Sequence, residues 1–306
     1  MGIVVIGAAF VDIKGFPHDI YIPNGRNVGR IEYIHGGVAR NVVEDIANVE
    51  LKPTFLSLVD DTPMGDAIVE KLKNHKVNTD YMLTVPDGMG TWLAVFDNNG
   101  DVAGSISKRP DLMPIVGMLE EKGDEIFSKI DTVVLESDID LPLVKKVLEL
   151  KNKHNVKLVG LVSNMGIAAK RRDLLQQFDC FICNQLEAGI FFADDYSEVT
   201  PEEMQEILAL KIKAANIPSM IVTMGEKGAV YADQNGNYGR CPSKKVHVKD
   251  TTGAGDAFCA GVAIGLTYGK TWEETIEIGS TLAASVITSS ENVCPRFLPE
   301  EFGIVL

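Results

Sequence analysis

The chain has few basic residues and no long hydrophobic run. Its 306 residues include 29 Lys and Arg against 43 Asp and Glu, which gives a formal net charge of -14. This excess of negative charge argues against a nucleic-acid surface and favours solubility, although an anionic nucleotide needs only a local cradle. Because neither a charged leader nor an apolar run of transmembrane length is present, we expect no membrane span and a cytoplasmic protein.

Cysteine and histidine are also scarce. Five cysteines, an odd number without regular spacing, indicate reduced thiols rather than a disulfide framework. Cys180 and Cys183 have C-x-x-C spacing, but a zinc site would need two further ligands nearby and a redox motif would need an exposed helix start. They lie in an apolar run that leads to Asn184, so we predict buried core cysteines. The five histidines show no metal-ligand spacing.

Two common nucleotide-binding motifs are missing. The first apolar run is followed by Gly7-Ala8-Ala9-Phe10, which is not G-x-G-x-x-G, so a dinucleotide-binding oxidoreductase is disfavoured. No G-K-[ST] follows a glycine loop, which argues against a Walker-type NTPase.

The most informative segment that is present runs from Asp250 to Phe258 and reads D-T-T-G-A-G-D-A-F. Gly253, Ala254 and Gly255 carry little or no side chain, so their N–H groups can reach an anion at the start of an apolar helix. Such a site suits a phosphoryl group in transfer, and Asp256 in the first turn could take the proton of an attacking hydroxyl. An isolated G-A-G-D would more often be an ordinary helix start.

Four further segments precede it. They are Asp12 after the apolar run 2–9, Gly36-Gly37-Val38-Ala39-Arg40-Asn41, Asn184-Gln185-Leu186-Glu187 and Thr223-Met224-Gly225-Glu226-Lys227-Gly228. Each alone is more often a turn or a helix start. In this order, together with the 250–261 segment, they resemble the signatures of the ribokinase-like (PfkB) family of carbohydrate and nucleoside kinases.

The resemblance implies an ATP-dependent kinase that phosphorylates a hydroxyl of a small sugar or nucleoside. It implies that Asp256 is the general base and that Gly253, Ala254 and Gly255 form the anion hole. The acceptor would be bound by Asp12, Gly36, Gly37, Arg40, Asn41 and Asp256. Arg40 has an alternative role, because it could simply pair with Glu44 one helical turn later.

The resemblance also assigns residues to the nucleotide and to metal ions. Asn184, Glu187, Thr223, Gly225, Gly228, Gly253 and Gly255 would bind ATP, with Mg2+ held by Glu187 through water. Asp250 and Thr252 match positions that bind a monovalent cation, with carbonyls around 285–294 as the other ligands. Because that stretch is shorter than in ribokinase, a dependence on K+ stays open.

Short apolar runs alternate with amphipathic stretches along the chain. This alternation predicts an α/β fold with a doubly wound, mostly parallel sheet flanked by helices, and a ligand crevice beyond the carboxyl ends of the strands. We see no repeat or linker, so we expect one ribokinase-like domain over 1–306. The predicted strands are 3–6, 55–59, 132–135, 158–162, 181–183 and 220–223, and the predicted helices are 38–50, 64–76, 140–154, 201–215, 253–268 and 272–288.

Residues 13–35 and 88–108 do not fit the alternation and are predicted to be strands and turns. Thr91 to Phe96 is apolar on both faces, and 97–101 is a hairpin turn. A small sheet of this kind needs a cover on each face, which matches the family's β lid over the substrate and its frequent homodimer. The alternative is a sheet packed wholly on its own domain.

The acceptor is harder to predict. Asn27 to Ile31, the Gly-Gly-Val-Ala-Arg-Asn motif and Ser290 to Pro295 are most similar to the pseudouridine-kinase branch. Against this, Gly160-Leu161-Val162-Ser163 stands where that branch has Asp-Pro-Val-Ser, and Lys170 is the nearest candidate for a displaced lysine. A sugar kinase of the ribokinase or fructokinase type, or a sensor that binds a sugar or nucleoside without turnover, are the alternatives. The presence of Asp256 argues against the sensor.

Overall fold

A central sheet of eight strands forms the body of the protein, and the computed structural model describes residues 1–305 of the chain. Leu306, the last residue of the predicted domain, lies outside the described residues. The strand order is β14-β13-β12-β11-β10-β9-β1-β4, parallel from β4 to β12 and antiparallel at β13 and β14. These strands are β1 (Ile3–Ile6), β4 (Thr54–Leu56), β9 (Thr132–Glu136), β10 (Lys157–Leu161), β11 (Cys180–Asn184), β12 (Ser219–Thr223), β13 (Ala229–Asp233) and β14 (Tyr238–Cys241).

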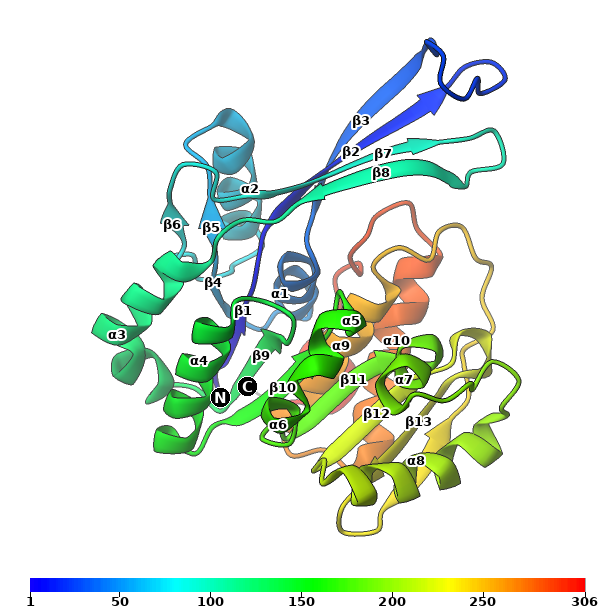
Figure 1. Cartoon of the computed structure of the whole chain (residues 1–306). Coiled ribbons are helices and arrows are strands. Elements are labelled where there is room, and N and C mark those ends of the chain that lie inside the picture. The colour runs from blue at the N-terminus through cyan, green and yellow to red at the C-terminus, as the bar shows by residue number, and fades with distance from the viewer. Residues whose placement is uncertain (306) are drawn as a thin grey trace.

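Helices cover both faces of this sheet (Figure 1). The side chains of β1 show why both covers are needed, because Val4 and Ile6 join one buried cluster while Ile3 and Val5 join the other. A short strand that is apolar on both faces is typical of a buried parallel sheet. One cluster includes α3 (Met113–Phe127), α4 (Leu141–His154), α5 (Met165–Ala168), α6 (Arg172–Leu175), α7 (Gln185–Phe192) and α8 (Pro201–Ala215), and the other includes α1 (Val38–Asn48), α2 (Pro63–Asn74), α9 (Ala254–Thr267) and α10 (Trp272–Ile287).

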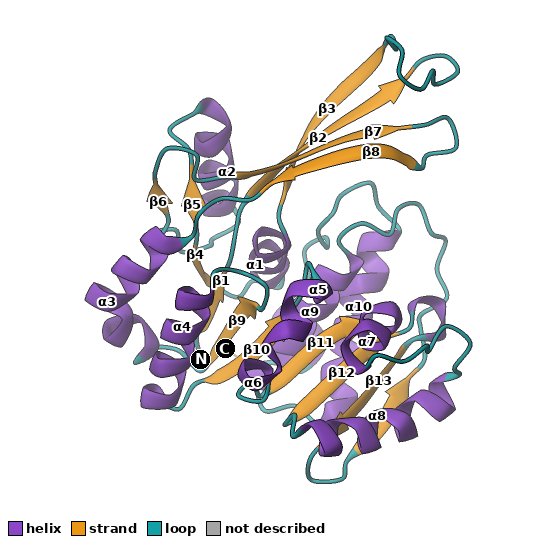
Figure 2. Ribbon diagram, in the orientation of Figure 1, coloured by secondary structure: helices purple, strands orange, loops and turns teal. Residues whose placement is uncertain are grey.

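A second sheet projects from the body, as Figure 2 shows. Its order is β3-β2-β7-β8, with β2 at Phe10–Pro17, β3 at Gly29–Gly36, β7 at Gly90–Phe96 and β8 at Val102–Lys108. The Asp97 carboxylate closes the predicted hairpin turn by accepting from the N–H groups of Asn99 and Asp101. The two segments that broke the alternation therefore pair with each other in one sheet. Its role as a lid stays a prediction.

Most predicted elements agree with the structure to within one or two residues. The capping box at Thr200 and Glu203 is confirmed, and Cys180 and Cys183 are buried free thiols as predicted. The predicted strand 55–59 is divided at Ser57 into β4 and β5 (Leu58–Val59), and β5 pairs with β6 (Leu83–Thr84). Among residues 1–305, no helix is both long and apolar enough to span a bilayer.

Candidate active site

The start of α9 presents free backbone donors. Gly253 caps the helix with a φ of 84°, and a side chain there would collide with the carbonyl of Asn292. Ala254 N–H donates to the Thr251 carbonyl at 3.2 Å. Within residues 1–305, the N–H groups of Gly253 and Gly255 donate to no other residue. Two of the three predicted donors are therefore available for an anion at a positive helix end.

Asp256 lies in the first turn of α9 and is half-buried. Its Oδ2 accepts a hydrogen bond from Nδ2 of Asn41 on α1 at 2.7 Å, which joins residues 215 positions apart. Burial raises the pKa of Asp256 to about 7, although the Asn41 hydrogen bond and the Arg40 charge lower it and the Asp12 charge raises it. A carboxylate with a pKa near neutrality is suited to accept a proton from a hydroxyl.

The Gly-Gly turn brings β3 into α1 beside Asp256. Gly37 caps α1 with a φ of 99°, a conformation that favours glycine. At Gly36 a Cβ would lie 2.5 Å from the Asp12 carboxylate, so only glycine lets Asp12 approach the turn this closely. Glu136 Oε1 fixes the helix start by accepting from Ala39 N–H at 2.9 Å. The structure thus brings the predicted acceptor residues together around Asp256.

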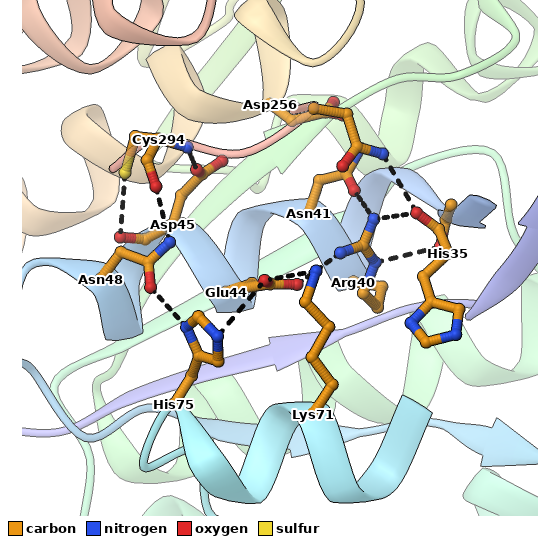
Figure 3. Close-up of polar contacts among 12 residues, drawn as sticks. His35, Arg40, Asn41, Glu44, Asp45, Asn48, Lys71, His75, Asp256 and Cys294 are labelled. Atoms are coloured by element: carbon orange, nitrogen blue, oxygen red, sulfur yellow. Dashed lines mark hydrogen bonds and ion pairs between the residues drawn. The ribbon is translucent and has the colours of Figure 1, made fainter. Parts of the chain in front are cut away.

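Arg40 is enclosed in a polar network under this turn (Figure 3). Its side chain is 1% exposed and donates to the carbonyls of His35 and Gly36. It also donates to Glu44 Oε2 and to Asn41 Oδ1. The alternative pairing of Arg40 with Glu44 is therefore present, and the same guanidinium also reaches Asn41, which bonds Asp256.

A cavity of about 740 Å³ adjoins the start of α9. It brings Thr223, Gly225 and Gly228 together with Ala254 and Gly255. The basic and apolar part of its wall was not predicted from the sequence, although the Lys-Lys pair before the glycine segment was a signal for it. This part comprises Lys227, Lys244, Lys245, Val246, Val248, Phe258, Ala283, Ala284 and Ile287. A cationic wall next to an apolar one fits the phosphates and base of a nucleotide.

The T-x-G-x-x-G segment is the turn between β12 and β13. Gly225 has a φ of 58° and Gly228 a φ of 97°, and Met224 N–H closes the turn on the Gly228 carbonyl at 2.7 Å. A side chain at Gly228 would collide with the carbonyl of Cys241. The glycines therefore permit both the turn and its close contact with the end of β14.

Asn184 and Glu187 lie on the other side of this turn. Asn184 lines a second cavity, of about 870 Å³, which shares Thr223 and Gly225 with the first. The two residues form a capping box for α7, with both hydrogen bonds at 2.8 Å, and Glu187 lines neither cavity. No three His, Cys, Asp or Glu side chains within residues 1–305 converge as a metal cage. A single carboxylate can hold Mg2+ through water when the ion keeps most of its waters and binds phosphate oxygens, so the role of Glu187 stays a prediction.

The segments predicted to hold a monovalent cation lie side by side. Lys249 N–H donates to the Ile287 carbonyl at 2.8 Å, and the Asn292 carbonyl packs against Gly253. Asp250 Oδ1 accepts from Thr252 N–H at 2.8 Å, a bond that lowers the pKa of Asp250. An ionised carboxylate beside backbone carbonyls fits a cation, and the roles of Asp250 and Thr252 stay a prediction.

Two buried carboxylates at the end of β9 were not predicted. Burial and the Asp138 charge raise the pKa of Glu136 to about 8. Asp138 accepts from Arg109 at 2.8 Å and from the Ser163 hydroxyl at 2.9 Å. The acidic Glu136-Ser137-Asp138 run after an apolar strand was the signal, because ligand sites lie at the carboxyl ends of parallel strands.

Gly160 has a packing reason for its departure from Asp-Pro-Val-Ser. A Cβ at this position would collide with the ring of Phe178, so an aspartate does not fit. The absence of that carboxylate therefore follows from core packing on this face of the sheet.

Comparison with known proteins connects this geometry to a family. The model of the pfkB family carbohydrate kinases matches residues 2–294. A guanosine-inosine kinase from Exiguobacterium acetylicum is 36% identical over 292 residues, 95% of each chain. A pseudouridine kinase from Escherichia coli is 24% identical over 289 residues, 94% of this chain and 90% of that one.

Solved structures give the same result for the fold. The ribokinase of Arabidopsis thaliana, complexed with ribose and ATP, superposes with a TM-score of 0.83 at 20% identity over 99% of each chain. The Thermotoga maritima ribokinase has a TM-score of 0.78 at 21% identity over 98% of each chain. The fold is ribokinase-like, as predicted. The chain belongs to the pfkB family of carbohydrate kinases and is a phosphotransferase that acts on a hydroxyl group.

Proposed function

We propose that the protein transfers the γ-phosphoryl group of ATP to a hydroxyl of a nucleoside, with Asp256 as the general base. The observation that supports this most is the head of α9, where the Asp256 carboxylate lies next to the free N–H groups of Gly253 and Gly255. A base and an anion hole within one helical turn are what transfer to a hydroxyl requires.

In this mechanism the acceptor lies against Asp12, Gly36, Gly37 and Asn41. Its hydroxyl proton moves to Asp256 as the oxygen bonds to the γ-phosphorus, and the bond to the β-phosphate oxygen breaks to leave ADP. The free N–H groups of Gly253 and Gly255 receive the charge on the transferring group. Glu187 would hold Mg2+ through a water molecule, and the ion would supply positive charge to the phosphates of ATP. The four-stranded sheet would close over the acceptor and exclude water.

We propose guanosine or inosine as the first acceptor to test, because the guanosine-inosine kinase relative is 36% identical over nearly the whole chain. Pseudouridine, our interpretation from the sequence motifs, stays a second prediction that the 24% identical relative supports less strongly. A sugar acceptor is the remaining alternative. We further propose that the phosphoryl donor is ATP, that the protein is cytoplasmic, and that K+ binds at Asp250 and Thr252.

The inner face of the four-stranded sheet supports a nucleoside over a free sugar. Asp12 on β2 faces the Gly-Gly turn, because its carboxylate lies against Gly36, and Lys14 shares this face by the alternation of the strand. Trp92 pairs directly with Asp12 across the β2–β7 ladder and so lies on the same face. Its ring lies perpendicular to that of Phe96, with the centroids 6.4 Å apart, and the Phe96 ring stacks on Phe16 with the centroids 4.8 Å apart. Aromatic rings on the same face as Asp12 offer a surface on which the base of a nucleoside acceptor can stack.

Trp92→Ala is expected to separate the two acceptor classes. Stacking of a base on an aromatic side chain contributes about 1–3 kcal/mol, so the KM for the nucleoside should rise about five-fold or more. The KM for ribose and for ATP should stay within about two-fold, because neither involves the base-binding surface. Trp92→Phe is the control and should retain most of the nucleoside preference. Equal losses for ribose and nucleoside in Trp92→Ala would contradict this role.

The outer face of the same sheet supports a homodimer. Ile31, Tyr33, Leu93, Val95 and Ile106 share this face by register and are 65%, 61%, 42%, 37% and 71% exposed. A contiguous apolar face of this kind is typical of a protein interface, and we propose that a second copy of the chain covers it. Ile106→Asp should convert a dimer into a monomer in sedimentation velocity without lowering the Tm. A wild-type protein that sediments as a monomer at every concentration would refute the proposal.

An acceptor panel tests the proposed function. The purified protein is incubated with Mg-ATP, with and without K+, and ADP release is scored against guanosine, inosine, pseudouridine, ribose and fructose. We expect the highest turnover with a purine nucleoside. Turnover with sugars alone would move the protein to the sugar-kinase branch, and binding without turnover would favour a sensor.

A further inference from the structure

Arg40 and Glu44 form a buried ion pair that stability alone does not account for. Both side chains are on α1, at 1% and 0% exposure, and Glu44 also contacts Lys71 of α2 at 2.8 Å. Burying charges is costly, and well-packed apolar residues often stabilise a fold as well as a buried ion pair does. The pair is therefore weak evidence for stability, and its contacts indicate what else it does.

The Arg40 guanidinium determines how Asn41 is oriented. An arginine can only donate hydrogen bonds, so the atom of Asn41 that faces it must be the carbonyl oxygen. The Asn41 NH2 group must then point the other way, toward Asp256 Oδ2 at 2.7 Å. Arg40 also donates to the carbonyls of His35 and Gly36. The Arg40 guanidinium thus fixes both the Gly-Gly turn and the Asn41 amide, which lies beside the proposed general base Asp256.

Glu44 in turn holds the guanidinium in place. Burial raises the pKa of Glu44, but the charges of Arg40 and Lys71 outweigh that effect and lower it, so Glu44 is ionised. Its two oxygens are divided between the cations, with Oε2 on Arg40 and Oε1 on Lys71. The chain of contacts runs from Lys71, half-buried on α2, through Glu44, Arg40 and Asn41 to Asp256 (Figure 3).

We propose that Glu44 is a positioning residue for phosphoryl transfer: by anchoring Arg40 it orients the Asn41 amide and the Gly-Gly turn toward the acceptor. The proposal rests on the proposed function and deepens it. Glu44 itself touches neither substrate, because Arg40 and Asn41 lie between it and Asp256. Replacing it with glutamine keeps the shape but removes the charge, and the amide can offer its oxygen to only one of the two cations.

The test compares Glu44→Gln and Arg40→Lys with Glu50→Gln. The lysine keeps the positive charge of Arg40 but loses the fork that reaches several acceptors at once. Glu50 is the matched control, since it pairs with Lys76 and Arg296 beyond the end of α1 and has no contact with Arg40. Steady-state kinetics give the KM for acceptor and for ATP separately, and thermal unfolding verifies the fold.

We expect Glu44→Gln and Arg40→Lys to raise the acceptor KM at least ten-fold while the ATP KM stays within about two-fold. Glu50→Gln should match the wild type. A carbon-13 titration of the Asp256 carboxyl should show a higher midpoint in both test variants, because the Asn41 donor is no longer held against it. Arg40, Asn41, Asp12, Asp45 and Cys259 are the groups that face this carboxyl and bear on the midpoint.

Folded variants with a wild-type acceptor KM and an unchanged Asp256 midpoint would overturn the proposal, as would equal losses for acceptor and ATP. Should Glu44→Gln not fold, Lys71→Met weakens the same anchor from its half-exposed end, and a smaller rise of two- to five-fold in acceptor KM is expected; an unchanged KM there counts against the proposal. The carbon-13 titration of the Asp256 carboxyl can be measured without any turnover of substrate. If the wild type phosphorylates no acceptor, the proposed function fails while the midpoint still decides whether Glu44 orients Asn41.

Discussion

Asp256→Asn is expected to lower kcat about 10³-fold or more while acceptor and nucleotide still bind, because a positioned general base contributes about 10²–10⁴-fold. The substitution is nearly isosteric. The amide oxygen at position 256 can still accept the hydrogen bond from Asn41, so the contact between α1 and α9 is retained. Steady-state kinetics together with calorimetric Kd values for acceptor and nucleotide measure the effect.

The control for this variant is the pH dependence. Burial raises the pKa of Asp256 to about 7, and the base must be deprotonated to act, so kcat/KM of the wild type should rise with pH through about 7. The kcat/KM of the Asp256→Asn variant should not show this rise with pH. Because the folded-state pKa of about 7 lies above the unfolded value of 3.8, stability is lost as the pH rises from about 4 to about 7, so at about pH 8 the variant should unfold at or above the wild-type Tm. Unchanged turnover in Asp256→Asn would refute the mechanism.

Gly253→Ala is expected to damage both the fold and the transfer step. At a φ of 84° an alanine is strained by about 1–2 kcal/mol, and its Cβ would collide with the Asn292 carbonyl. Moving the helix start displaces N–H groups that are each worth about 3–4 kcal/mol to a developing anion, so kcat should fall about 10²-fold or more. Thermal unfolding should show a lower Tm.

Gly255→Ala is the matched control for the backbone. It lies one position inside α9, and a Cβ there meets no atom within 4 Å. Alanine favours a helix more than glycine does, so the Tm should be unchanged or higher. Because Gly255 lines the 740 Å³ cavity, the variant should affect the ATP KM instead. A wild-type Tm and kcat in Gly253→Ala would show that this glycine is not required by the site.

Local signals predicted most of the fold. The Thr200 cap, the alternation of apolar runs and helices, and the apolar faces around 91–96 are properties of neighbouring residues, and the corresponding elements are present. α3 was missed because Pro114, Gly117 and Gly123 interrupt its helical pattern. The antiparallel strands β13 and β14 were missed as well, since strands of only five and four residues carry a weak periodic signal.

The candidate site was predictable only where one segment carries the chemistry. The Gly253 helix start and the Gly-Gly turn could be interpreted from their own residues. Two contacts of the site join distant segments of the chain: the hydrogen bond between Asn41 and Asp256, and the ion pair between Glu44 and Lys71. No pattern of neighbouring residues predicts such contacts. The same holds for the lysines that line the nucleotide-side cavity. These contacts depend on the tertiary packing of α1 against α2 and α9.

The most direct test of the central claim is to identify the product. The protein is incubated with Mg-ATP and inosine or guanosine, and the nucleosides are analysed by mass spectrometry and phosphorus-31 NMR beside an Asp256→Asn sample. The account predicts a nucleoside that has gained one phosphoryl group for each ADP formed, and no such product with the variant. ADP release without a phosphorylated nucleoside, or equal product from both proteins, would contradict it.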